Sequence, residues 1–203
     1  MTKLSDYRSR ITAEAFDGIP PNEEFPIDGY YDALVRRNEK FYELRGEFPA
    51  GYEDITFVKQ LTRGQQLLLL LGIFDGQVKK GGFTQFVWNY PGYIFPVRDA
   101  IAYLGQSELL ANYDKAIESL AGKKELWLEL RKEWRRAGEN PQWETFQRTG
   151  EILDFSWFDD AYNDQYGRNS EGQWVVLSPG LNSMLLTKLA RYIRANKDEF
   201  IEM

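Results

Sequence analysis

The sequence contains neither cysteine nor histidine, and these two absences exclude several kinds of functional site. Without cysteine the chain forms no disulfide, no thiolate zinc site and no cysteine nucleophile. Without histidine, Ser-His-Asp and Cys-His catalysis cannot be built, and the commonest general base and metal ligand is missing. Catalysis would have to use carboxylates, lysine, tyrosine or backbone donors. We therefore favour a protein that is not an enzyme, and we expect no catalytic residues, no metal and no cofactor.

Long hydrophobic runs are also missing. The longest, LLLLLGIF at residues 67–74, is far shorter than the ~20 residues of a membrane-spanning helix. The N-terminal stretch MTKLSDYRSR carries charges throughout and lacks the apolar core of a signal peptide. The net charge of −6 disfavours binding to DNA phosphates or to anionic membranes. We expect a cytoplasmic protein that contacts neither nucleic acid nor membrane directly.

Apolar residues recur at helical spacing along most of the chain, which predicts an all-α fold. We expect a single compact multi-helix domain of about 8–10 helices, in which residues 1–59 form an N-terminal helical extension packed on a core at 60–203. The one strand candidate, QWVVL at 173–177, has no evident pairing partner. The helices expected from the pattern cover residues 28–46, 60–79, 96–104, 107–122, 123–137 and 179–196.

The stretch GGFTQFVWNY, residues 81–90, has no charged residue, although 28% of the chain is charged. It lacks the lysine and the preceding strand of a phosphate-binding loop, so the two glycines predict a sharp corner between helices. An anion held at the following helix N-terminus is the alternative. The helix after the corner has one face that is polar but uncharged. This face predicts either amide side chains that hold a neighbouring segment in place or a groove around Gln85, Trp88 and Asn89. A helical wheel separates Phe83, Phe86, Val87 and Tyr90 from Thr84, Gln85, Trp88 and Asn89.

Negative charge is concentrated in EILDFSWFDDAYNDQYGRNSE, residues 151–171, where six carboxylates accompany one basic residue, Arg168. The segment is either an ordinary solvated face or an acidic docking surface for a basic protein partner. Its spacing does not match a calcium-binding loop. Adjacent Asp159 and Asp160 diverge by about 100° on a helix and form a poor acid–base pair. The candidate surface consists of Glu151, Asp154, Asp159, Asp160, Asp164 and Glu171.

Four segments in order, GGFTQFVWN, AIAYLGQSELLANYDKAI, LDFSWFDDAYND and LLTKLARYIRANKDEF, carry a resemblance to a known family. Together they resemble the bacterial DNA-mimic protein family, long described as a domain of unknown function, over roughly residues 60–201. Lys80 departs from the asparagine usual in that family. The signature comprises Gly81, Gly82, Phe83, Gln85, Phe86 and Asn89, with Trp88 inside it, and later matches are Leu153, Asp154, Tyr162, Tyr192, Ile193, Asn196 and Phe200.

The resemblance implies an all-α fold and no known enzymatic activity. For a characterised member it also implies a dimer whose surface carboxylates imitate DNA phosphates and occupy a DNA-binding protein. A net charge of −6 with 25 basic residues is a sparse imitation of a duplex, which carries one charge per about 1.7 Å. We expect a protein partner, in particular a DNA-binding protein, and a homodimer. The alternative is a small-molecule or peptide-binding module, or an enzyme, that uses an uncharged pocket around Gln85, Trp88 and Asn89.

Overall fold

The computed structural model describes residues 10–22, 26–47, 55–136 and 139–202. Ten α-helices and one two-stranded sheet lie within these ranges, which confirms the expected all-α fold. In chain order the α-helices and strands are α1 (Ala13–Asp17), α2 (Asp28–Tyr31), α3 (Glu39–Gly46), α4 (Arg63–Asn89), α5 (Ile94–Tyr103), α6 (Ser107–Gly122), α7 (Lys124–Arg136), α8 (Glu139–Leu153), α9 (Ser156–Tyr162), β1 (Gln165–Arg168), β2 (Trp174–Ser178) and α10 (Leu181–Ala195). A π-helical turn (Asp32–Arg36) and 3-10 turns at Val58–Gln60, Pro91–Tyr93 and Lys197–Glu199 connect them.

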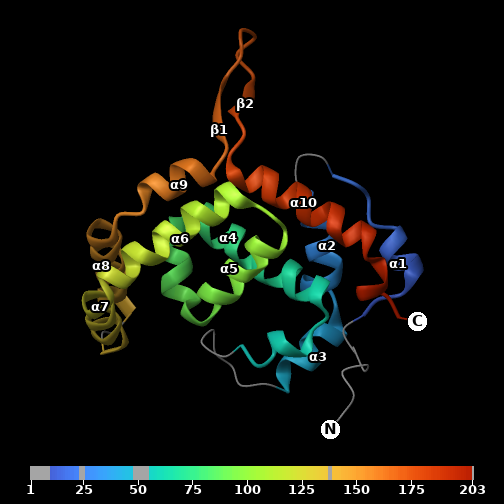
Figure 1. The fold of residues 1–203 in the computed structure, drawn as a ribbon, viewed down its shortest axis with the longest axis horizontal. Helices are drawn as coiled ribbons and strands as arrows, with labels where there is room; N and C mark the ends of the chain where they lie inside the picture. The colour runs from blue at the N-terminus through green and yellow to red at the C-terminus, as the bar shows by residue number, and fades with distance from the viewer. Residues whose placement is uncertain (1–9, 23–25, 48–54, 137–138, 203) are drawn as a thin grey trace.

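Helix α4 is the central element, and α5, α9 and α10 pack against it (Figure 1). Its leucine run is buried around the helix, as expected for a helix that is covered on most sides. Thr62 starts the helix through a capping box: its hydroxyl accepts from the Gln65 N–H, and the Gln65 side chain accepts from the Thr62 N–H. Phe74, which is fully buried, lies in van der Waals reach of five other aromatic rings and marks the centre of the core.

The N-terminal elements bury their apolar residues in the same hydrophobic cluster as α4, through Phe16, Tyr30 and Phe41. The single helix expected over 28–46 is divided in the structure, because Asn38 leaves the helical conformation and caps α3. Its side-chain oxygen accepts a hydrogen bond from the Phe41 N–H at 3.3 Å. Short polar side chains such as that of asparagine can form hydrogen bonds with nearby backbone groups, and these bonds compete with continuation of the helix.

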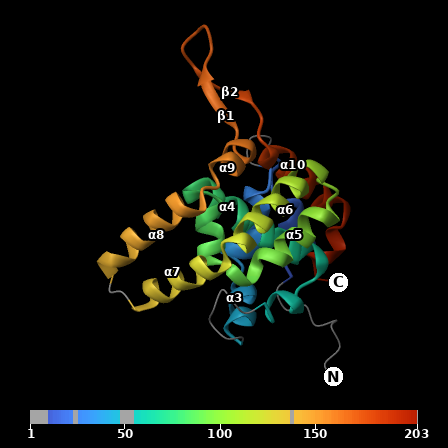
Figure 2. The same ribbon diagram turned by 60° about the vertical axis from the view of Figure 1, so that its left-hand side comes forward.

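Helices α7 and α8 run side by side as an antiparallel pair that projects from the body (Figure 2). Glycine, asparagine and proline at 138–141 were interpreted as the end of the helical region, so α8 was not predicted. Proline is tolerated in the first turn of a helix, where its missing N–H has no intrahelical partner anyway. Pro141 occupies that position in α8.

The strand expected at 173–177 does have a partner, which corrects the sequence interpretation. Strand β2 pairs antiparallel with β1, and Tyr166 lies opposite Val176. Both strands form a ribbon that extends away from the helices (Figure 1). Asn169 closes the turn by accepting hydrogen bonds from the N–H groups of Glu171 and Gln173.

Candidate interaction surface and glycine corner

The glycine corner predicted from the sequence is present inside α4. Gly81 and Gly82 leave the helical conformation, so α4 consists of two helical halves joined by a kink. Gly82 has φ +74° and ψ 180°, a region that is essentially restricted to glycine. A Cβ atom at this position would lie 2.2 Å from Asp159 Oδ2. Both the backbone conformation and the close approach of α9 therefore require glycine at position 82.

Asp159 joins the glycine corner to the acidic segment. Its Oδ1 accepts a hydrogen bond of 2.7 Å from the N–H of Phe83, the first residue after the corner. The second half of α4 begins here without a local cap, so a carboxylate from α9 satisfies a backbone donor of its first turn. Burial raises the pKa of Asp159 to about 6; the Phe83 N–H opposes this shift, and the neighbouring charge of Asp160 adds to it.

The aromatic face of the second half of α4 packs into the core, as the helical wheel predicts. Phe83, Phe86 and Val87 are fully buried, while Tyr90 is half-buried. The ring of Phe83 lies 4.7 Å from that of Phe158 and 5.4 Å from that of Tyr113. These contacts fix α9 against the corner and hold Asp159 in place.

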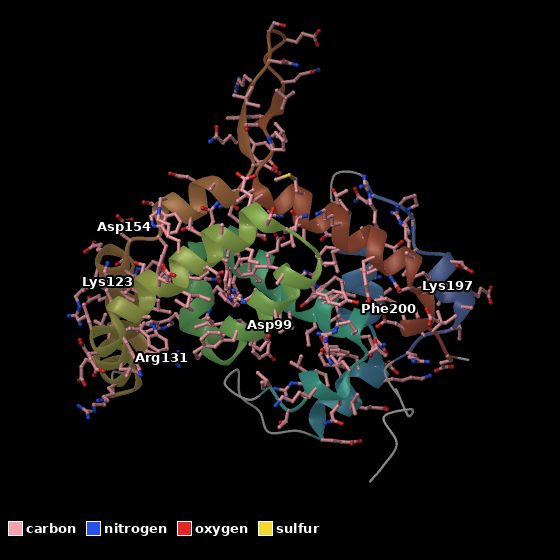
Figure 3. The ribbon with its side chains drawn as sticks, viewed as in Figure 1. Asp99, Lys123, Arg131, Asp154, Lys197 and Phe200 are labelled. Carbon is pink, nitrogen blue, oxygen red and sulfur yellow. The ribbon has the colours of Figure 1, made fainter. Side chains whose placement is uncertain are left out.

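The uncharged face of the same segment is occupied by contacts within the protein. Gln85 and Asn89 each donate a side-chain hydrogen bond to Gln77 Oε1, at 3.0 and 2.8 Å. Gln77 belongs to the first half of α4, so this amide cluster bridges the kink. Trp88 is buried, and its carbonyl accepts a hydrogen bond of 2.9 Å from Arg131 of α7. Figure 3 labels Arg131 on the α7 side of the molecule.

Two surface cavities among the residues that the structure describes lie elsewhere. One lies between α10 and the N-terminal segment, and the other at the turn between α6 and α7. Gln85, Trp88 and Asn89 line neither of them. Their observed contacts are those of side chains that tie elements together.

The structure separates the six acidic residues into three groups. Glu151, Asp154 and Asp160 are exposed around the junction of α8 and α9. Asp159 and Asp164 are partly buried and bonded to the backbone, whereas Glu171 lies in the turn of the β-hairpin, away from the others.

Asp164 caps α10, although the β-hairpin separates the two in the sequence. Its Oδ1 accepts hydrogen bonds from the Gly180 N–H at 2.6 Å and from the Ser183 hydroxyl at 2.7 Å. The side chain thus supplies the acceptor that the N-terminus of α10 requires. The helix begins at Leu181, two residues later than the Pro179 start expected from the sequence.

Asp154 lies at the N-terminus of α9, where its carboxylate accepts from the Ser156 hydroxyl at 2.7 Å. This hydrogen bond is the main cause that lowers the pKa of Asp154. Lys123 lies beside it (Figure 3) and donates to the carbonyls of Ile152 and Leu153, the last residues of α8. The lowered pKa favours the ionised form of Asp154, and the nearby lysine is engaged with a helix C-terminus.

A buried polar pair in the core, Asp75 and Tyr162, was not predicted by the sequence analysis. The hydroxyl of Tyr162 donates to Asp75 Oδ1 at 3.0 Å, and Lys79 lies 3.0 Å from the other oxygen. Burial raises the pKa of Asp75. The isolated aspartate within the apolar stretch around LLGIFDG is the sequence signal that could have found this site.

The later family matches near the C-terminus make contacts within the protein. Phe200 is fully buried and packs against Phe16 and Gly64, and the hydroxyl of Tyr192 donates to Glu199 at 2.6 Å. Ile193 is fully buried, and the side chain of Asn196 donates to the Tyr192 carbonyl. Through Phe200, the segment after α10 packs against α1 and the start of α4.

Two further features bear on function. Within residues 10–22, 26–47, 55–136 and 139–202, no cluster of three or more acidic side chains could hold a metal ion. In the same ranges, none of the helices has the length and apolar character needed to cross a membrane.

Comparison with known proteins gives a single family assignment. Neither the curated proteins nor the solved structures include a significant match. The model of the family described as DMP19-like protein matches residues 59–196, which is more than half of the chain and contains the glycine corner, α8, α9 and α10. The chain therefore belongs to the DMP19-like protein family.

Proposed function

We propose that this protein is a non-enzymatic interaction protein that presents carboxylates to the basic surface of a DNA-binding partner, in the manner of a DNA mimic. Membership of the DMP19-like family supports this role. The observation that carries it is the set of exposed carboxylates at the α8–α9 junction. We call this set the junction surface; it consists of Glu118, Glu151, Asp154 and Asp160.

The geometry of α9 aligns two of these carboxylates. Asp154 is bonded to Ser156, and Asp160 lies one helical turn beyond Ser156 on the same exposed face. Four residues of helix span roughly 6 Å along the axis. A DNA strand presents one phosphate per about 3.4 Å of axis, so the junction surface is a sparser array of charge than DNA.

Helix α6 brings a further carboxylate to the same surface. Lys115 lies over the ring of Trp157 at 4.1 Å, and Lys123 contacts the end of α8. Glu118 is exposed and follows Lys115 by three residues, so it lies on the side of α6 from which Lys115 reaches Trp157 of α9. The four carboxylates of the junction surface outnumber these two lysines, which leaves the surface with an excess of negative charge.

Electrostatic recognition by this surface is tested by capture of partners from an extract of related cells on the immobilised protein. Charge-dominated complexes form at low salt and dissociate as salt shortens the screening length from about 10 Å at 0.1 M to about 3 Å at 1 M. The variant Glu151→Gln/Asp160→Asn should release the partner at lower salt than the wild type. Asp154 is left intact because it caps α9.

The matched control is Glu43→Gln/Asp198→Asn, which removes the same charge from exposed positions far from the junction. It should release the partner at the wild-type salt concentration. A partner that is retained unchanged at about 1 M salt would contradict an electrostatic mimic.

The same proposal includes a homodimer, for which the β-hairpin offers apolar surface. Tyr166, Trp174 and Leu177 are 60%, 68% and 65% exposed, and Val176 is nearly half exposed. A large aromatic side chain has 150–250 Å² of surface, so these four side chains expose roughly 450 Å² per copy. Side chains alternate along a strand, so Trp174 and Val176 share one face of the ribbon with Tyr166, whereas Leu177 lies on the other face. A second copy on one face would therefore bury less than twice this area. The hairpin itself carries one arginine and one glutamate, so it suits a neutral second copy better than a basic partner.

Two further expectations belong to this proposal. Residues 1–59 would be a helical extension packed on the family domain at 60–203, which the start of the family match at residue 59 supports. The protein would act in the cytoplasm, where a DNA-binding partner of a bacterial protein is found.

A further inference from the structure

Trp157 of α9 lies between two acidic residues of the junction surface in the sequence, Asp154 and Asp160. It is half-buried, and its ring packs edge-on against the fully buried ring of Phe158, with a distance of 6.0 Å between the ring centroids and an interplanar angle of 82°. This contact with the core holds the indole in one orientation. A rigid aromatic side chain loses little conformational entropy when a partner binds to it.

The ring of Trp157 already carries a cation from the neighbouring helix α6, which packs against α9 (Figure 1). The Nζ atom of Lys115 lies 4.1 Å from the ring centroid, which is a close cation–π contact. Lys115 is exposed, so its ammonium group reaches the ring from the solvent side and can leave it for water. The face of the indole that Lys115 covers is therefore open to a cation from a partner once the lysine moves away.

Both helices that form this contact also carry an exposed carboxylate beside it. Asp160 follows Trp157 by three residues on α9, so the two side chains lie on the same side of that helix. Glu118 has the same relation to Lys115 on α6. A cation bound to the indole is therefore attracted by the ring and by negative charge on two helices.

We propose that Trp157 is the specificity-determining residue of the junction surface, and that it receives an arginine side chain of the basic partner in place of Lys115. This inference rests on the proposed function, because it names the side chain that the junction surface recognises. A guanidinium is planar and weakly hydrated, so it stacks on an aromatic face and can donate to a carboxylate at the same time. The ammonium of a lysine is a compact, strongly hydrated charge and gains less from the same ring.

The test compares two peptides of equal charge, hexa-arginine and hexa-lysine, by titration calorimetry with the full chain at low salt. The wild type should bind hexa-arginine about threefold more tightly than hexa-lysine, which is the size of effect expected for an exposed cation–π contact. Trp157→Leu leaves the charge of the surface unchanged and should abolish this preference. Trp143→Leu, which removes a 62% exposed indole from α8, is the matched control and should retain it.

A second variant tests the competition between Lys115 and the partner without changing the net charge. Lys115→Arg gives the ring an internal cation that stacks better, so it should weaken the binding of hexa-arginine about threefold. Lys59→Arg makes the same change at an exposed position outside the junction and should leave binding unchanged. Because Lys115 is exposed, its substitution leaves the core intact and keeps the test decisive even if Trp157→Leu loosens α9.

The NMR signal of the Trp157 indole N–H, assigned with Trp157→Phe, reports where the peptide binds and should shift on addition of hexa-arginine. The proposal is overturned if the wild type binds both peptides equally, if Trp157→Leu keeps the arginine preference, or if Lys115→Arg binds hexa-arginine as tightly as the wild type. Each of these results leaves the electrostatic role of the junction surface standing. Absence of binding by both peptides would instead contradict that role as well.

Discussion

Asp159 is the residue at which the glycine corner and the acidic segment meet. It lies 76 positions after Phe83, whose N–H it accepts, so no local pattern in the sequence could pair the two. The sequence analysis treated Asp159 as one member of a solvated cluster together with Asp160. In the structure Asp160 is exposed, whereas Asp159 is partly buried and has a raised pKa. Neighbouring carboxylates thus have different roles because a helix turns them in different directions.

The raised pKa of Asp159 predicts a measurable dependence of stability on pH. Folding raises this pKa from 3.8 to about 6, so between these values the folded chain retains a proton that the unfolded chain has released. The free energy of unfolding contributed by Asp159 therefore falls as pH rises from about 4 to 6. The expected change is about 1–2 kcal/mol, reduced from the full linkage value because the carboxylate is partly solvated.

Asp159→Asn separates this effect from that of all other titrating groups. The amide oxygen can still accept from the Phe83 N–H, and no charge is desolvated. The stability of the wild type relative to this variant, measured by urea unfolding, should fall between pH 4 and pH 7. Glu151→Gln, at an exposed position, should show no such difference. A constant difference between the wild type and Asp159→Asn across this range would show that the carboxylate is not buried.

At the scale of elements, the kink in α4 is the feature that the fold depends on most directly. Gly82→Ala should destabilise the protein by at least about 2 kcal/mol, because the backbone at φ +74° excludes a side chain and Asp159 Oδ2 occupies the space. Gly76→Ala is the matched control in the same helix, since no atom lies within 4 Å of its added Cβ. It should stabilise by about 0.5–1 kcal/mol. Equal effects of the two changes in urea unfolding would argue against a fixed corner.

Substitutions of exposed side chains in the β-hairpin should affect the stability of the fold least. Trp174→Ser/Leu177→Ser should leave the free energy of unfolding within about 0.5 kcal/mol of the wild type, because both side chains are exposed. If the hairpin mediates the homodimer, the same variant should be monomeric at concentrations where the wild type sediments as a dimer. Glu39→Gln, at an exposed position in α3, serves as the control. A dimer that survives the double substitution would assign the interface to another surface.

Local chemistry explains which elements could be predicted from the sequence. The apolar period predicts α6, α7 and α10 to within a few residues, and the paired glycines predict the corner in α4. Helix α8 was missed because Pro141 was read as a breaker. Strand β1 was missed because QYGR is short and polar, although the turn residues Asn169 and Gly172 are typical of a hairpin.

The candidate site was predictable only in part, for a related reason. Gln85 and Asn89 stand out because neutral amides are unusual on an exposed helix face of a charged protein. Their acceptor, Gln77, lies across the kink, and its position depends on the angle between the two halves of α4.

At the scale of the whole molecule, the surfaces proposed to bind partners belong to different elements. The exposed carboxylates of the junction surface lie on α6 and around the junction of α8 and α9, whereas the exposed apolar side chains lie on the β-hairpin. A protein that relied only on its net charge of −6 would not compete with DNA for a basic protein. The proposed mimicry therefore depends on the local arrangement of Glu118, Glu151, Asp154 and Asp160.

Competition with DNA for the captured partner tests this role most directly. A labelled duplex is bound to the partner, the protein is added, and fluorescence anisotropy reports release of the duplex. A DNA mimic and DNA occupy the same basic surface, so the wild type should release the duplex completely, and Glu151→Gln/Asp160→Asn should require a several-fold higher concentration. A ternary complex in which the partner holds both the duplex and the protein would contradict mimicry of DNA.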